Sequence, residues 1–134
     1  MEVELGRETP GRYHVKYGRG GLVDIEFLVQ ALQLVHGARH PDVRRASTAA
    51  ALAGLARIGA LARVGELADQ HRFLRRVSAA LRLLGARPSD TLELAGPMPA
   101  RLASALAYPD RQAFLEDYRR RTAAVRAAYT EHLP

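Results

Sequence analysis

The sequence of 134 residues contains no cysteine and no tryptophan, and aromatic residues make up only 6% of it. Without cysteine, the chain forms no disulfide and offers no thiolate to a metal ion. Apolar residues make up 48% but occur in short groups, far from the roughly 20 in a row that span a bilayer. No basic start followed by an apolar stretch marks a secretory signal. These absences predict a cytoplasmic protein without a membrane segment.

Lysine is nearly absent as well. All of the 20 basic residues except Lys16 are arginine, and the formal net charge is +6. Such a charge attracts nucleic acid or acidic protein surfaces. The arginines are spread over every segment, however, and the few aromatic residues form no stacking platform for single-stranded nucleic acid. We therefore expect no nucleic-acid partner and attribute the arginines to compositional bias and solvated helix faces.

What the sequence does contain is helical periodicity. From Gly21 onward, apolar residues recur at spacings of three and four, and no alternating strand of convincing length is present. The length suits one domain with its own core. We predict an all-α bundle of about five helices, preceded by a short extended segment at 12–17. The predicted helices cover 21–37, 47–58, 65–84, 99–107 and a last stretch from 110 to beyond 129.

Local signals set the ends of these helices. Ser47 is a favoured N-cap, Pro99 suits a first helical turn, and Asp110 caps the last helix. Gly37 ends the first helix. Residues 85–99 contain several prolines and are predicted to form a loop.

The most informative segment runs from Lys16 to Gln30, where a glycine-rich turn leads into an apolar helix. Gly18, Gly20 and Gly21 permit positive φ and close backbone packing. The helix N-terminus that follows presents unpaired N–H groups. The pattern predicts either an anion-binding turn or a tight entry into a buried helix. Its glycine spacing matches neither a P-loop nor a dinucleotide-binding turn.

Two acidic residues, Asp24 and Glu26, occupy the first turns of this helix. Because they are two positions apart, their side chains point roughly 200° apart and cannot chelate one ion together. Both carboxylates suit the positive end of the helix dipole. Apolar neighbours suggest that Glu26 is partly buried with a polar partner, for which an arginine is a candidate. The candidate partners are Arg44, Arg45 and Arg75.

No catalytic residue and no metal site are predicted. His36 and His40 have the spacing of a zinc pair, but Gly37 and Pro41 interrupt the helix and no third ligand is evident. Ser47 has no nucleophile elbow around it, which leaves it as a helix cap.

Taken whole, residues 16–37 resemble a signature of the bifunctional glutamine synthetase adenylyltransferase family. The matching elements are Lys16, Gly18-Arg19-Gly20-Gly21, Asp24-Ile25-Glu26-Phe27, Val29-Gln30 and Leu34-Val35-His36-Gly37. Looser matches at 44–48, 73–76 and 102–108 extend the resemblance over nearly the whole chain. Uridylyltransferases that modify the PII signal protein share the Gly-Gly-Leu-x-Asp element. The chain departs from the family at His14, where Asp is usual, and at Ala107, where glycine is preferred.

The resemblance implies a parent enzyme with two nucleotidyltransferase domains, each followed by a helical bundle. One half transfers AMP from ATP to glutamine synthetase, the other removes it by phosphorolysis, and both use Mg²⁺. Here the Gly-Ser and the paired carboxylates of the catalytic site are absent, and Asp117 stands isolated in an amphipathic helix. We therefore expect an inactive fragment without bound ATP or Mg²⁺. Residues 1–20 would be a remnant and linker of the missing catalytic domain, with 1–5 ending one of its helices, and 21–134 the bundle.

The resemblance also assigns expected roles. Lys16, Gly18, Arg19, Gly20 and Gly21 would border the nucleotide cleft, whereas Asp24 and Glu26 would orient that turn or contact the catalytic domain. Expected partners of the parent enzyme are glutamine synthetase and the PII signal protein. The C-terminal copy is favoured, because the sequence ends shortly after its last amphipathic helix. The alternative is a stand-alone basic module that binds an acidic protein or nucleic acid.

Overall fold

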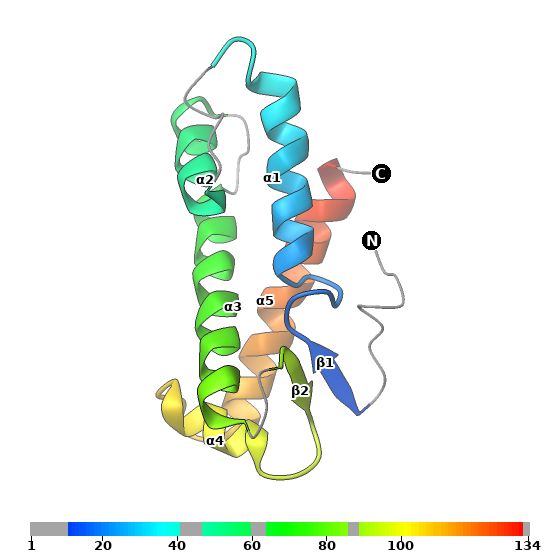
Figure 1. Ribbon diagram of the computed structural model, residues 1–134, viewed down its shortest axis with the longest axis vertical. Helices are drawn as coiled ribbons and strands as arrows, with labels where there is room; N and C mark the ends of the chain where they lie inside the picture. Colours follow the sequence, from blue (N-terminus) through cyan, green and yellow to red (C-terminus); the bar gives the residue numbers. More distant parts are fainter. Residues whose placement is uncertain (1–10, 41–46, 60–63, 86–88, 133–134) are drawn as a thin grey trace.

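The computed structural model describes residues 11–40, 47–59, 64–85 and 89–132. Within these ranges, five helices and one small antiparallel sheet form the fold (Figure 1). The elements are β1 (Arg12–His14), α1 (Leu22–His36), α2 (Thr48–Arg57), α3 (Val64–Leu84), β2 (Thr91–Glu93), α4 (Met98–Ala105) and α5 (Arg111–His132). The predicted all-α bundle is thereby confirmed.

The long helices α1, α3 and α5 pack against one another and enclose the core. The shorter α2 packs on α1 and α3, and α4 packs on α3 and α5 at the end of the bundle near the sheet (Figure 1). Ile25, Leu28, Leu74 and Phe114 are all fully buried. Each such side chain contributes about 1.5–3 kcal/mol by leaving water. Burial of these apolar side chains between the helices therefore holds the bundle together.

The helix ends agree with their local signals. The Ser47 hydroxyl accepts a hydrogen bond from the Ala50 N–H at 3.4 Å, and an Asp110 carboxylate oxygen accepts one from Ala113 at 2.8 Å. Pro99 lies in the first turn of α4. The predicted caps of α2 and α5 are confirmed, since their side chains satisfy N–H groups that lack a partner within the helix.

Only one strand of the sheet was predicted. β1 confirms part of the predicted extended segment, but its partner β2 lies in residues 85–99, which we predicted to be entirely loop. That prediction was wrong because a strand of three residues shows no alternating pattern, and its pairing is with a distant segment. Tyr13 pairs with Leu92, and the Val15 N–H donates to the Asp90 carbonyl at 2.8 Å. Val15 and Leu92 are fully buried, so the segment before the glycine turn belongs to the core.

Some predictions concern residues outside the described ranges. These are the helix end at 1–5 and two of the proposed partners of Glu26, Arg44 and Arg45. Of the helices in the described ranges, none is both long enough and apolar enough to cross a membrane.

Candidate functional site

The glycine turn is closed by its own backbone. The N–H groups of Gly21, Leu22 and Val23 donate to carbonyl oxygens within residues 15–18, over 2.9–3.1 Å. These are the groups that an anion at the start of α1 would need, because intrahelical acceptors are missing there. Since the chain already occupies them, the geometry supports the tight entry into a buried helix over an anion-binding turn.

Glycine is required at two positions for steric reasons. Gly20 has φ +71°, and a Cβ placed on it would lie 2.0 Å from the carbonyl oxygen of Thr122 in α5. A Cβ on Gly21 would lie 2.6 Å from the carbonyl oxygen of Val15. Both distances are far below a normal van der Waals contact, so the turn lies directly against the backbone of α5 and of its own preceding segment.

Asp24 ties the turn to α5. Its side chain is only 1% exposed, and one carboxylate oxygen accepts a hydrogen bond from the Gly20 N–H at 2.7 Å. The same oxygen lies 3.3 Å from Nη1 of Arg126, whose guanidinium stacks over the ring of Tyr129. A buried carboxylate needs such partners to offset its loss of hydration. Asp24 thus joins two segments about a hundred positions apart in sequence.

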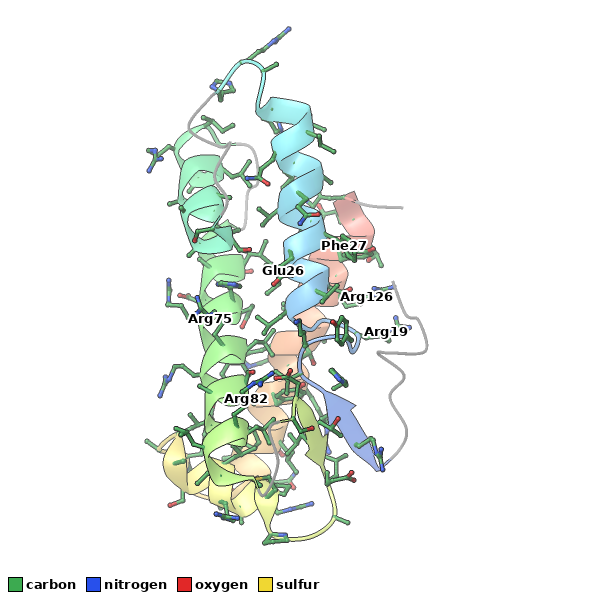
Figure 2. The ribbon with its side chains drawn as sticks, in the orientation of Figure 1. Arg19, Glu26, Phe27, Arg75, Arg82 and Arg126 are labelled. Atoms are coloured by element: carbon green, nitrogen blue, oxygen red, sulfur yellow. The ribbon has the colours of Figure 1, made fainter. Side chains whose placement is uncertain are left out.

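An open cavity of about 430 Å³ lies beside this junction along α5, and we refer to it as the arginine groove. Its lining includes Arg19, Arg119 and Arg126, and none of its described lining residues is acidic. Tyr13 and Tyr118, stacked with ring centroids 5.0 Å apart, form one wall, and the Arg119 Nε donates to the Tyr13 hydroxyl. Figure 2 shows Arg19 and Arg126 on the same side of the molecule, away from Arg75. The volume of the arginine groove falls in the usual range for ligand sites, and the positive charge of its lining suits an anionic partner.

Lys16 and His14 lie just before the turn. Lys16 is half-buried, with Nζ 5.3 Å from the ring centroid of Tyr17. Nδ1 of His14 accepts a hydrogen bond from the Tyr17 N–H at 3.0 Å. Burial lowers the pKa of His14, Lys16 lowers it further, and Asp90 opposes the shift. A neutral imidazole can therefore accept the hydrogen bond that an aspartate at this position would also accept.

Glu26 faces the other side of α1. It lines a second pocket, of about 240 Å³, together with the start of α2 and with His71 and Arg75 of α3. The prediction that Asp24 and Glu26 diverge is confirmed, and Glu26 is half-buried as expected. Among its three suggested partners, Arg75 is the one in the described ranges; it lines the same pocket, but no hydrogen bond or ion pair joins it to Glu26.

Asp117, which we expected to be isolated, lies at the centre of a hydrogen-bond network. Its carboxylate accepts hydrogen bonds from Tyr108, Arg120 and Arg121, and Arg121 also donates to the Gln70 side chain at 2.9 Å. Burial and the Asp117 contact raise the pKa of Tyr108 to about 12. Burial also acts to raise the pKa of Asp117, but its hydrogen bonds outweigh this and the net shift is downward. The helical spacing of the two arginines from Asp117 was the available signal.

No metal-ligand set is found in the part of the chain that the structure describes, where no three His, Asp or Glu side chains gather as ligands would. Asp24 and Asp117 are both engaged by arginine. Mg²⁺ usually takes carboxylate oxygens together with substrate phosphates. The described residues therefore do not fit a Mg²⁺ site, whereas the groove offers cationic side chains for an anion.

Similarity to known proteins gives independent evidence of the family to which the chain is related. A family model described as GlnD PII-uridylyltransferase matches residues 4–133. A bifunctional glutamine synthetase adenylyltransferase/adenylyl-removing enzyme of Bradyrhizobium diazoefficiens is 40% identical over 87% of this chain and 12% of its own length. Enzymes of the same name from Xanthomonas campestris pv. campestris (strain B100) and Streptomyces avermitilis are 37% and 38% identical, over 89% and 98% of this chain. The matches take up 13% and 14% of those enzymes. The chain thus spans about an eighth of the length of the relatives.

Proposed function

This chain belongs to the GlnD PII-uridylyltransferase family, and from that premise we propose that it is a helical domain of a nucleotidyltransferase that adenylylates and deadenylylates glutamine synthetase. The observation that carries the proposal is the identity of 37–40% between most of this chain and a short part of enzymes with that name. A uridylyltransferase acting on the PII protein is the related possibility within the family. The adenylyltransferase is favoured because its name is borne by these relatives.

In this proposal the bundle positions charge next to a catalytic domain. Phosphoryl and nucleotidyl transfer depend mainly on orientation and on stabilising negative charge. Lys16 lies just before the glycine turn and Arg19 lies within it, and Arg19 also lines the arginine groove with Arg119 and Arg126. Gly18, Gly20 and Gly21 contribute shape, since the backbone donors of the turn bind the chain itself. Asp24 holds the turn against α5, which fixes where the two cationic side chains project.

We assign ATP and Mg²⁺ to the catalytic domain of the parent enzyme. ATP and Mg²⁺ supply the AMP group and the neutralisation of phosphate charge, and the described residues of this chain supply cationic side chains beside them. Glutamine synthetase and the PII protein are the proposed partners, and the cytoplasm is the proposed location. The fragment by itself is proposed to be inactive.

The proposal is tested in the full-length parent enzyme. Lys16→Ala and Arg19→Ala should each lower kcat/KM for ATP about tenfold in AMP transfer to glutamine synthetase, because each removes charge near the phosphates. Arg101→Ala is the matched control, since Arg101 is exposed on α4, away from the turn and the arginine groove. Kinetics unchanged by both substitutions would exclude a role at the cleft border. Labelled ATP with the chain alone should leave glutamine synthetase unlabelled.

The second candidate is a stand-alone basic module, which the arginine groove favours because its lining is cationic. A gel-shift titration with generic DNA at low and moderate salt distinguishes the two, since binding through phosphates weakens steeply with salt. Strong, salt-sensitive binding by the chain alone would support the module. A gene whose reading frame continues upstream into a Gly-Ser and paired-carboxylate region would support the enzyme domain.

A further inference from the structure

The pocket on the Glu26 side of α1 is separate from the arginine groove, and we call it the α2 pocket. It has a volume of about 240 Å³ and lies where α1, the start of α2 and the middle of α3 meet. In Figure 2, Glu26 lies between α1 and α3, Arg75 lies on α3, and Arg19 lies on the other side of α1. Nothing in the proposed function uses this pocket.

His71 is the first observation that points to a ligand. It is only 6% exposed, it lines the α2 pocket, and no hydrogen bond connects it to any described residue. Its ring nitrogens are not sealed inside the protein but open onto this pocket, where a ligand can bind them. Burial lowers the pKa of His71, and Arg75 and Arg72 lower it further. The ring is therefore neutral near pH 7 and offers one N–H donor to the pocket.

The start of α2 is the second observation. The N–H groups of Ala50 and Ala51 are bound by Ser47, through its hydroxyl and its carbonyl oxygen. The N–H groups of Thr48 and Ala49 have no acceptor in the described ranges, and both residues line the pocket. No acidic residue occupies the first turn of α2. Free N–H groups and the positive helix end together favour an anion.

Two charged side chains complete the α2 pocket. Arg75 adds a guanidinium, whereas Glu26 adds a half-buried carboxylate. A carboxylate at neutral pH only accepts hydrogen bonds, so a ligand beside Glu26 must itself donate one. A fully ionised oxyanion such as sulfate has no proton to donate, but hydrogen phosphate keeps one at neutral pH. Phosphate monoesters lose theirs near pH 6.

We propose that the α2 pocket binds inorganic phosphate as hydrogen phosphate. Its unprotonated oxygens accept hydrogen bonds from the Thr48 and Ala49 N–H groups, from His71 and from Arg75. Its P–OH group donates to Glu26. In this arrangement the His71 imidazole gains a hydrogen-bond acceptor, and the Glu26 carboxylate selects an anion that still carries a proton.

The test is a titration of the isotopically labelled chain followed by the backbone amide signals of Thr48 and Ala49. Sodium phosphate should shift both signals to saturation, and sodium sulfate at matched ionic strength should bind about tenfold more weakly, because it leaves Glu26 facing an unprotonated oxygen. Absence of saturable shifts at these amides would overturn the proposal. Equal affinity for sulfate would also overturn it, with an adventitious anion site as the result.

Two pairs of variants sharpen the test. Arg75→Gln should weaken phosphate binding about fivefold, the loss of one charge-assisted hydrogen bond. Arg72→Gln removes the same charge from the same helix, but Arg72 pairs with Asp69 and does not line the pocket, so binding should persist. Equal weakening by both would mean general charge attraction and would count against the site.

Glu26→Gln tests the selectivity directly. The amide can donate a hydrogen bond, so sulfate should then bind at least as well as phosphate. An unchanged preference for phosphate would contradict the role of Glu26. His71→Gln keeps a donor and should retain phosphate binding, whereas His71→Leu should lose it. If the leucine variant does not fold, the variants of Arg75 and Glu26 still decide the proposal.

Discussion

Asp24 and Glu26 are only two residues apart, but they lie on two faces of α1 with very different surroundings. On one face, Asp24 is 1% exposed and binds both the glycine turn and Arg126 of α5. On the other, Glu26 is half-buried and faces a pocket whose helix N–H groups and imidazole have no partner in the described ranges. The same chemical group therefore closes a packed junction at one position and lines a ligand-sized space at the other.

The two faces differ because a different helix packs against each of them. On the Asp24 side, α5 presents its backbone so closely that Gly20 has no room for a side chain. On the Glu26 side, α2 presents its N-terminus, where N–H groups remain without intrahelical acceptors. A filled junction stabilises the fold, whereas an unfilled pocket leaves polar groups without protein partners at some cost to stability. Substitutions on the two faces should accordingly differ in effect.

The largest expected effect is that of Gly20→Ala. The new methyl group would meet the Thr122 carbonyl at 2.0 Å with φ at +71°, so we expect a loss of about 3 kcal/mol or more in the free energy of unfolding. Gly96→Ala is the control, because its φ is +88° but nothing lies within 4 Å of the added group. It should cost only about 1 kcal/mol. Urea denaturation followed by circular dichroism measures both, and equal losses would contradict the close packing of the turn.

Next in size is Asp24→Ala. It removes the acceptor of the Gly20 N–H and the ion pair with Arg126, so unfolding free energy should fall by about 2–3 kcal/mol. Glu26→Ala should change it by less than about 0.5 kcal/mol, because no ion pair or hydrogen bond in the described ranges depends on it. Chemical denaturation of both variants measures this contrast. Similar losses of unfolding free energy in Asp24→Ala and Glu26→Ala would contradict the proposed difference between the two faces of α1.

A pH titration gives the third effect. The pKa values of His14 and His71 are lowered in the folded chain, so below about pH 6.5 the unfolded state binds more protons. Stability should be complete above that pH and fall on acidification, by at most about 1.4 kcal/mol per pH unit for each histidine. Denaturation midpoints between about pH 7.5 and 5 show the slope. His71→Gln should reduce it, and a slope of opposite sign would contradict the burial of both rings.

The smallest effect is expected for Tyr13→Phe in the wall of the arginine groove. This change removes the hydrogen bond from Arg119 but keeps the stacking on Tyr118, so the loss should be about 0.5 kcal/mol for an exposed bond. Thermal unfolding is sensitive enough to detect it. A loss as large as that for Asp24→Ala would mean that the groove wall, too, belongs to the packed junction.

Features that depend on nearby residues were predictable. The caps of α2 and α5 follow from Ser47 and Asp110, which bind N–H groups three residues ahead. The divergence of Asp24 and Glu26 follows from the angle between successive residues in a helix. β2 was missed because three residues carry no period and its partner β1 lies far away in sequence. The network at Asp117 was missed because it joins α3 and α5 as well as neighbouring turns.

The sequence by itself determined that the chain is helical, that glycines precede α1, and that its first two carboxylates point in different directions. These are consequences of local backbone geometry, which a short window contains. Only the tertiary structure decided that Arg126 reaches Asp24, that Gly20 lies against Thr122, and that His71 meets the start of α2 beside Glu26. Residues tens of positions apart must meet before a face is either filled or left open, and that depends on how whole helices pack.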